Sequence, residues 1–219
     1  MYKHVLFDLD GTLTDPGLGI TNSIMHALRH FGMEVPAREE LYQFIGPPLY
    51  ETFIDYYGFS EEKADEGVRV FRENYQVNGL FENEVYDGIP QTLSELKKRG
   101  CKIHLATSKP EPFAIRILEH FDLIKYFDFV AGSTMNTNLG ADGGRTTKAE
   151  VIRHVLTSNN ITDTSEVIMV GDRRHDVEGA AEHNIKTIGV LFGYGSRGEL
   201  ESSGAAYVVE RPQEILNYI

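Results

Sequence analysis

From residue 86 to residue 219 the sequence alternates between short apolar runs and amphipathic helical segments. Strand-like runs are predicted at 101–106, 127–131, 166–170, 186–191 and 207–209. Strands that alternate with helices over short connections form parallel sheets, because each crossover helix returns the chain to the end of the sheet where the preceding strand began. The sequence therefore predicts an α/β fold in which a doubly wound, Rossmann-like parallel sheet is covered by helices on both faces.

A helical block interrupts this pattern near the N-terminus. Apolar residues recur at helical spacing in 20–31, and further helical patterns follow in 38–44, 49–57 and 60–78 without a strand-like run between them. We therefore expect residues 16–85 to form an inserted all-helical cap domain, and residues 1–15 with 86–219 to form the α/β core. The polar stretch 136–145, which contains three glycines, is expected to be a loop.

Two carboxylates, Asp8 and Asp10, directly follow the apolar run Val5-Leu6-Phe7, and Gly11 then allows a sharp turn. Side chains two residues apart in an extended chain share a face, so both acids can act on one ligand. Ionised carboxylates at this distance repel each other, and the arrangement calls for a cation or a shared proton. The alternative is an Asp-rich turn that only closes the strand.

Other polar side chains follow later strands of the predicted sheet. Thr107 and Ser108 follow one strand, Asp172 and then Asp176 follow another, and Lys148 begins the helix before the latter. Because ligands of open parallel sheets bind beyond the carboxyl ends of the strands, we expect these side chains to meet at one edge. Several carboxylates there would make a hard oxygen site suited to Mg²⁺. Taken singly, each residue could instead cap a helix, lie in solvent or close a turn.

The composition limits the class of partner. Of the 219 residues, 41% are hydrophobic, which suffices for a packed core. The formal net charge of −12 opposes binding to nucleic acid polymers or anionic membranes, and no apolar run is long enough to span a bilayer. Met1 leads directly into the first strand without a signal peptide, and the single cysteine, Cys101, can form no internal disulfide, so we expect a cytoplasmic protein. The sequence does not indicate the oligomeric state.

Four motifs resemble those of the haloacid dehalogenase superfamily. In chain order they are Asp8-Leu9-Asp10-Gly11-Thr12-Leu13, Thr107, Lys148, and Gly171-Asp172 through Asp176. The resemblance covers essentially the whole chain, and the helical block between the first two motifs is similar to the cap of the phosphoglycolate phosphatase-like branch, which also contains 5'-nucleotidases. Two positions depart from the pattern: Ala149 follows Lys148 where many relatives have proline, and Ser108 stands where phosphoglycolate phosphatases often have asparagine.

The resemblance implies a Mg²⁺-dependent phosphomonoesterase that acts on a small-molecule phosphate ester, with phosphoglycolate and nucleoside 5'-monophosphates as the first substrates to test. Asp8 would attack phosphorus and form an aspartyl-phosphate, while Asp10 would protonate the leaving group and later activate water. Thr107 and Lys148 would neutralise the phosphoryl oxygens.

The resemblance also implies the ligands of the metal and of the substrate. The metal would be held by Asp8, the backbone carbonyl of Asp10 and Asp172, with Asp176 close by as a ligand or a supporting acid. The predicted substrate contacts are Gly11, Thr12, Ser108 and Lys109 in the core, and Gly46 and Pro47 in the cap. The loop Gly46-Pro47-Pro48 would be a rigid specificity loop or, equally, a simple helix breaker.

Three other functions stay open at this point. A sugar phosphomutase would use the same acid pair and differ in cap contacts that shield the intermediate from water. A dehalogenase is disfavoured, because Asp10 would have no leaving alkoxide to protonate. A receiver-like signalling domain also gathers acids, a threonine and a lysine on an α/β sheet, but the inserted helical block and the order of the motifs argue against it.

Overall fold

The computed structural model describes residues 2–47, 49–134 and 144–219, so Pro48 and most of the expected loop at 136–145 lie outside the described residues. Contacts divide the chain into two compact units, Met1–Thr14 with Val85–Ile219, and Asp15–Glu84. The sequence predicts a domain boundary one residue later at each end of the insertion. Each unit is described below by itself.

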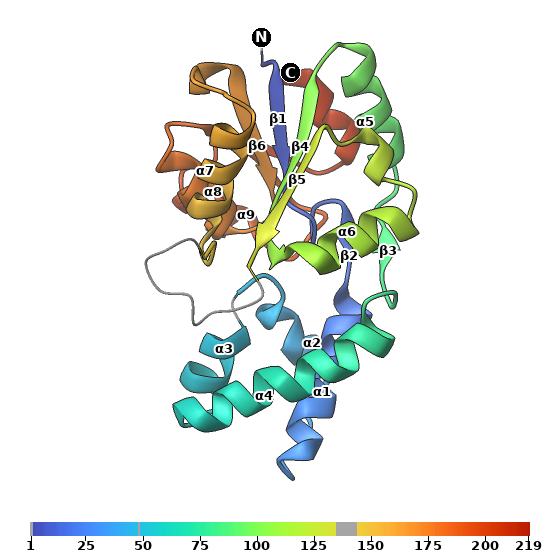
Figure 1. The fold of residues 1–219 in the computed structure, drawn as a ribbon, viewed down its shortest axis with the longest axis vertical. Helices are drawn as coiled ribbons and strands as arrows, with labels where there is room; N and C mark the ends of the chain where they lie inside the picture. Colours follow the sequence, from blue (N-terminus) through green and yellow to red (C-terminus); the bar gives the residue numbers. More distant parts are fainter. Residues whose placement is uncertain (1, 48, 135–143) are drawn as a thin grey trace. The chain divides into compact units, whose positions relative to one another are not determined.

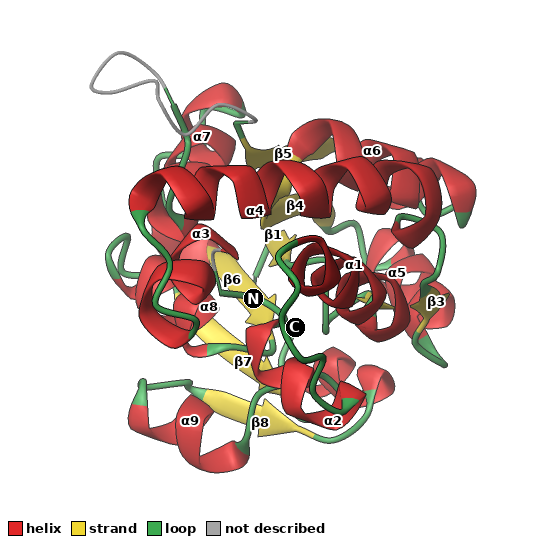
Figure 2. Cartoon of the chain, turned by 90° about the horizontal axis from the view of Figure 1, so that it is seen from below, coloured by secondary structure: helices red, strands yellow, loops and turns green. Residues whose placement is uncertain are grey.

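In the described part of the first unit, six parallel strands form one sheet in the order β5-β4-β1-β6-β7-β8, as Figure 2 shows. Their bounds are β1 (His4–Phe7), β4 (Lys102–Pro110), β5 (Phe129–Ser133), β6 (Val167–Gly171), β7 (Lys186–Val190) and β8 (Tyr207–Val209). The chain adds β4 and β5 on one side of β1 and then β6, β7 and β8 on the other, so the direction of winding reverses at β1. The predicted doubly wound parallel sheet is confirmed.

Helices cover both faces of this sheet (Figure 1). They are α5 (Ile89–Lys98), α6 (Glu111–His120), α7 (Lys148–Ser158), α8 (Arg174–Ala181) and α9 (Arg197–Ser202). Helices α7 and α8 lie on one side of the sheet, while α5 and α6 lie on the other (Figure 1, Figure 2). Near the C-terminus the chain forms a 3₁₀ segment, η6 (Pro212–Asn217). Two further 3₁₀ turns are η4 (Ile124–Tyr126) and η5 (Thr164–Glu166).

The core of this unit lies between the sheet and its helices. Leu6 of β1 and Met169 of β6 pack in one buried cluster with Val151 of α7. On the other face, Ile89 and Leu93 of α5 are fully buried. Burying an apolar side chain of this size contributes roughly 1.5–3 kcal/mol. The apolar runs that predict the strands are therefore buried beneath helices on both faces of the sheet.

The strand register sets where the polar residues begin. Phe7 lies opposite Leu105 of β4 and opposite Val170 of β6. The backbone N–H of Asp8 donates to the carbonyl of Val170 at 3.0 Å, although Asp8 lies beyond the strand. The side chain of Asp8 is thus held at the carboxyl edge of the sheet, next to the position where the winding reverses.

Two short strands mark the junction of the insertion. They are β2 (Thr14–Asp15) and β3 (Glu84–Val85), which pair with each other. Just inside the first unit, the N–H of Tyr86 donates to the carbonyl of Leu13 at 3.1 Å. The points where the chain leaves and re-enters the first unit are therefore hydrogen-bonded neighbours.

The second unit is helical throughout its described interior. Its helices are α1 (Gly17–His30), α2 (Arg38–Leu41), α3 (Leu49–Glu51) and α4 (Glu61–Asn74). A 3₁₀ turn at Tyr42–Phe44 continues α2, and π-helical turns at Thr52–Tyr56 and Tyr75–Gly79 continue α3 and α4. Among the described helices of the whole chain, none combines the length and the apolar character that crossing a bilayer requires.

Helix α1 and the π-helical turn that continues α4 approach closely through glycine. A Cβ at Gly19 would collide with the backbone carbonyl of Gly79, so only glycine permits this contact. Helix α4 begins at the side chain of Ser60, which accepts a hydrogen bond from the N–H of Lys63 at 3.3 Å. The Ser60 cap agrees with the helix start that the sequence predicts.

Candidate active site

Three buried carboxylates converge at the carboxyl edge of the sheet. Asp8 follows β1, Asp172 follows β6, and Asp176 lies in the first turn of α8. Each offers an oxygen within 4.8 Å of the others, and this is the one such cluster of metal-ligating side chains among the residues that the structure describes. Asp172 and Asp176 are each only 1% exposed. We call these three residues the carboxylate cluster.

Lys148 supplies positive charge to the carboxylate cluster. Its Nζ lies 2.8 Å from Asp8 Oδ1 and 2.7 Å from Asp176 Oδ1, and it donates a hydrogen bond to the carbonyl of Ala106 at 3.0 Å. Apart from Lys148, neither of these two oxygens has a hydrogen-bond partner among the described residues. Both oxygens therefore keep lone pairs for a further ligand.

A capping box fixes the position of Lys148. The Thr147 hydroxyl accepts from the N–H of Glu150 at 3.2 Å, and Glu150 Oε2 accepts from the N–H of Thr147 at 3.0 Å. This cap starts α7 at Lys148, where a cation is unfavourable because the helix dipole is positive at its N-terminus. Asp8 and Asp176 compensate for that placement.

Helix α8 begins at Arg174, three residues before the apolar helical pattern that starts at Val177. Asp176 consequently lies in the first helical turn, where a carboxylate is favourable. Its Oδ2 accepts a hydrogen bond from the N–H of Arg173 at 3.1 Å. Asp176 follows β6 as expected, and it does so inside the first turn of α8 because the helix begins before the apolar periodicity does.

Main-chain groups hold Asp172 in place. Its Oδ2 accepts a hydrogen bond from the N–H of Tyr194 at 2.8 Å, and the Thr12 hydroxyl lies 3.5 Å from its Oδ1. Gly11 has a φ of 79°, and a Cβ there would collide with the Asp172 carboxylate. Gly11 and Thr12, predicted to contact substrate, thus lie beside Asp172. Nothing in the sequence analysis pointed to Tyr194.

Asp10 is paired with a residue predicted to contact substrate. Its Oδ2 lies 2.7 Å from Lys109 Nζ, and the two side chains are only 14% and 6% exposed. Its Oδ1 is buried and accepts no hydrogen bond from the described residues. The Asp10 carboxylate is not part of the carboxylate cluster, and the role of its backbone carbonyl as a metal ligand stays a prediction.

Thr107 lies within β4, which continues to Pro110, four residues beyond the predicted end. Its side chain is buried, and its hydroxyl accepts the N–H of Lys109 at 3.2 Å. Ser108 is half-buried on the same strand. Gly46 and Pro47 belong to the helical unit, where Gly46 has a φ of 105°. The predicted contacts of these residues with substrate stay predictions.

The charge balance of the site shows in its pKa values. Burial, together with the neighbouring Asp176 and Asp8, raises the pKa of Asp172 well above its usual range. Burial also raises the pKa of Asp176 to about 6, although Lys148 opposes the shift. Burial would lower the pKa of Lys148, but Asp176 and Asp8 outweigh it and raise that pKa.

One ammonium group does not neutralise three carboxylates. Buried like charges destabilise each other unless a cation or a proton compensates them. The carboxylate cluster offers hard oxygen donors in a buried setting, which fits a divalent cation such as Mg²⁺. Asp10 has a different charge partner from the carboxylate cluster: burial raises the pKa of Asp10, and Lys109 opposes that rise.

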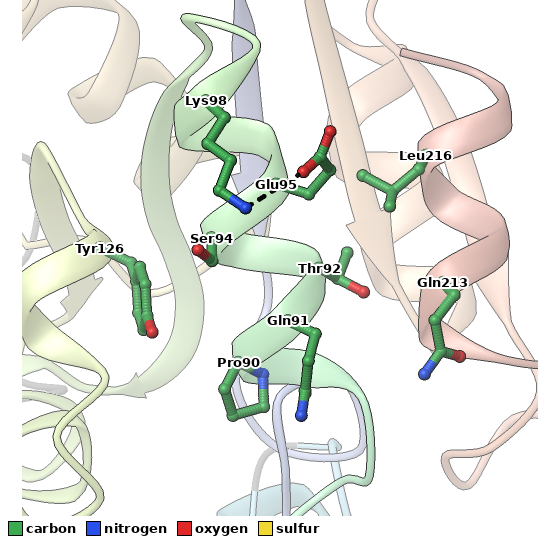
Figure 3. A pocket seen from close by; sticks show the side chains of 9 residues that line it. All are labelled: Pro90, Gln91, Thr92, Ser94, Glu95, Lys98, Tyr126, Gln213 and Leu216. Carbon is green, nitrogen blue, oxygen red and sulfur yellow. Dashed lines mark ion pairs between the residues drawn. The ribbon is translucent and has the colours of Figure 1, made fainter.

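A separate pocket of about 570 Å³ lies along α5 and η6 (Figure 3). Gln91, Ser94 and Gln213 contribute to its lining, and Glu95 pairs with Lys98 at 3.6 Å. No residue of the carboxylate cluster lines this pocket.

Comparison with known proteins gives consistent matches. The model of the haloacid dehalogenase-like hydrolase family matches residues 5–190. The chain is 45% identical to the 5'-nucleotidase of Pseudomonas aeruginosa, over 92% of this chain and 88% of that protein. It is 39% identical to the tyrosine-protein kinase PtkA of Mycobacterium tuberculosis, over 93% of this chain and 67% of that protein. Among solved structures, a predicted phosphatase from Clostridium acetobutylicum is 44% identical, with a TM-score of 0.93 and coverage of 100% of this chain and 98% of that one.

Proposed function

Because the chain belongs to the haloacid dehalogenase-like hydrolase family and is a phosphatase, we propose that it is a Mg²⁺-dependent phosphomonoesterase that forms an aspartyl-phosphate on Asp8. The observation that carries the proposal is the buried carboxylate cluster with Lys148 in ion-pair distance of Asp8. Phosphatases of this family generally use a divalent metal, and the donors of the cluster fit one.

In the first step, a carboxylate oxygen of Asp8 attacks phosphorus while the bond from phosphorus to the ester oxygen breaks. Protonated Asp10 gives its proton to the leaving alkoxide, which departs as an alcohol. Burial favours the protonated form of Asp10, because it raises the pKa of that carboxyl. The products of this step are the aspartyl-phosphate and an ionised Asp10.

In the second step, ionised Asp10 accepts a proton from water as the water oxygen attacks phosphorus. The bond from phosphorus to Asp8 breaks, inorganic phosphate leaves, and both carboxyl groups regain their starting protonation states. One residue thus serves as acid and then as base, which needs a pKa near the working pH.

Lys148 and Thr107 would bind the phosphoryl oxygens, which carry negative charge throughout. Asp8, Asp172 and Asp176, with the backbone carbonyl of Asp10, would hold the metal. When bound, a divalent cation supplies further positive charge to the phosphoryl group and orients it. Local positive charge matters here because the chain as a whole carries a net charge of −12.

The substrate class is a small phosphate monoester, and nucleoside 5'-monophosphates are the first choice because of the similarity to a 5'-nucleotidase. The test is a panel of nucleotides, phosphoglycolate and sugar phosphates compared by kcat/KM. We expect one nucleoside 5'-monophosphate to exceed the other classes by at least about tenfold. Equal and low rates for the whole panel would contradict this substrate class.

Metal dependence is tested by removing divalent cations with a chelator and then adding back Mg²⁺ or Ca²⁺. We expect chelation to abolish phosphate release and Mg²⁺ to restore it. ATP with a tyrosine-containing polymer serves as a further assay, because one relative carries the name of a tyrosine kinase. Label transfer to tyrosine without phosphate release would contradict the hydrolase mechanism.

A further inference from the structure

We infer that residues 193–195 form a main-chain clamp that fixes the Asp172 carboxylate in the orientation needed to bind a divalent cation. Tyr194 acts through its backbone N–H, and Gly193 and Gly195 act by leaving room for the chain to approach Asp172. These three are positioning residues, since they act through Asp172. The inference rests on the metal site of the proposed function.

The hydrogen bond from Tyr194 is the central contact of the clamp. Its N–H donates to Asp172 Oδ2 at 2.8 Å, and Asp172 is only 1% exposed. The carboxyl group cannot rotate about its Cβ–Cγ bond without losing this contact. A buried carboxylate that loses a charge-assisted hydrogen bond is destabilised, because no water replaces the donor. The contact therefore selects one orientation of the carboxylate.

Gly193 is needed for space. A Cβ on residue 193 would lie 2.6 Å from both Cβ and Oδ2 of Asp172, and it would also collide with the carbonyl of Gly11. The backbone of Gly193 therefore packs directly against Asp172 and against the turn at Gly11 within the first motif. A larger residue must displace one of them.

Gly195 is needed for space on the other side of Tyr194. A Cβ there would collide with the backbone carbonyl of Asp172, which cannot move as a flexible side chain could. Neither Gly193 nor Gly195 has a φ in the left-handed region. Their backbone conformation is open to other residues, so close packing on Asp172 is what requires glycine at both positions.

The ends of the clamp are tied to the rest of the unit. The N–H of Leu191 donates to the carbonyl of Val209 at 2.9 Å, and the ring of Phe192 packs against Tyr86 with centroids 5.1 Å apart. These contacts fix the chain just before the clamp.

Helix α9 fixes the chain just after the clamp. Glu199 Oε1 accepts from Arg173 Nε and from the N–H of Arg174, each at 2.9 Å. The segment that carries Tyr194 is therefore held on both sides of the central hydrogen bond, and after the clamp it is bonded directly to the residues that follow Asp172. Loss of a residue that orients a metal ligand in this way typically weakens metal binding by about 10–100-fold.

The experiment compares Gly193→Ala and Gly195→Ala with the matched control Gly198→Ala. A Cβ at Gly198 meets nothing within 4 Å, and the residue lies three positions from the clamp. Mg²⁺ binding is measured by isothermal titration calorimetry on the metal-free proteins, with circular dichroism to verify folding. We expect the Kd for Mg²⁺ to rise about 10–100-fold in the first two variants. The control should match the wild type.

The outcomes separate this inference from the proposed function. If the wild type binds Mg²⁺ and both Gly193→Ala and Gly195→Ala bind it with the same Kd, the clamp is overturned and the metal site is not. A wild type that binds no Mg²⁺ would overturn the metal site, and the clamp with it.

A second measurement tests the clamp even where an alanine variant does not fold. Hydrogen exchange at the Tyr194 amide is followed in the metal-free wild type and in Asp172→Ala, with the Glu150 amide as the internal control, because it is bonded to Thr147 Oγ1. We expect exchange at Tyr194 to be at least tenfold faster in the variant and exchange at Glu150 to be unchanged. Equal rates at Tyr194 would overturn the inference.

Discussion

Lys109 Nζ lies 2.7 Å from Asp10 Oδ2, and both side chains are largely withdrawn from water. Burial raises the pKa of Asp10, while Lys109 opposes the rise and the nearby Asp8 adds to it. The proposed acid is therefore held between an environment that favours its protonation and an ammonium group that disfavours it.

Replacing Lys109 should move the alkaline limb of the pH profile. Without the ammonium group the pKa of Asp10 rises further, and the residue stays protonated for the first step to a higher pH. We expect the fall of kcat/KM at alkaline pH to shift upward by about one unit or more in Lys109→Gln. The profile of kcat/KM against pH measures this. Lys125→Gln is the control, since Lys125 pairs with Asp122 at the surface; an unmoved limb in Lys109→Gln would contradict the role of the pair.

The two acids of the first motif should differ when each is changed to an amide. Asp8→Asn should abolish turnover, because an amide cannot act as the nucleophile. Asp10→Asn should lose roughly 10²–10⁴-fold in kcat, as expected for a general acid and base. Mg²⁺ binding should largely survive in Asp10→Asn, since the proposed ligand there is the backbone carbonyl. Phosphate release and calorimetry measure the two effects, and a normal rate in Asp10→Asn would remove that residue from its role.

Lys148→Met should destabilise the metal-free protein most at alkaline pH. Removing one partner of a buried ion pair costs about 3–5 kcal/mol, because the remaining charges are uncompensated. Carboxyl groups whose pKa is raised on folding lower stability above that pKa and cease to do so once protonated. Since the pKa of Asp176 is already about 6, the loss in Lys148→Met should be larger at pH 8 than at pH 5.

Denaturant unfolding at the two pH values measures this effect. Lys186→Met is the control, because Lys186 is exposed at the start of β7. A loss of stability in Lys148→Met that is the same at pH 8 and pH 5 would show that the lysine does not compensate the carboxylates.

His104 should make the fold sensitive to acid. Its Nε2 lies 3.0 Å from His4 Nδ1, and burial, assisted by His4, lowers the pKa of His104 to about 4. The unfolded chain therefore binds a proton at a higher pH than the folded chain, so stability is lost as the pH falls from about 6.5 toward 4. We expect this residue to account for about 2 kcal/mol of lost stability between pH 7 and pH 5. Unfolding of the wild type and His104→Gln at both pH values checks it; the same pH dependence in both would contradict the assignment.

The fold could be predicted because its signals are local. The run Val5-Leu6-Phe7 and the later apolar runs mark buried strands, and the helical patterns between them imply parallel connections. In a parallel sheet the carboxyl ends of the strands share one edge, so the proximity of Asp8 and Asp172 follows from the topology. The chemical roles of these residues do not follow from topology alone and stay proposals.

The remaining features depend on contacts that one sequence does not display. Helix α8 starts at Arg174 because Asp176 accepts the N–H of Arg173, while the apolar pattern begins only at Val177. The pairing of Lys109 with Asp10 joins side chains almost one hundred residues apart. The N–H of Tyr194 carries no sequence signal, because every residue except proline has one.

The hydrogen bond between Tyr86 and Leu13 has a consequence for how this architecture can change. The two ends of the inserted segment are already joined by a hydrogen bond within the first unit, so we expect the strand register to be independent of the number of residues inserted between them. Long insertions at such a point cost little extra closure entropy, since that cost grows only with the logarithm of length. We therefore expect that the segment between Asp15 and Glu84 can be shortened, lengthened or replaced while the residues at the strand ends keep their positions.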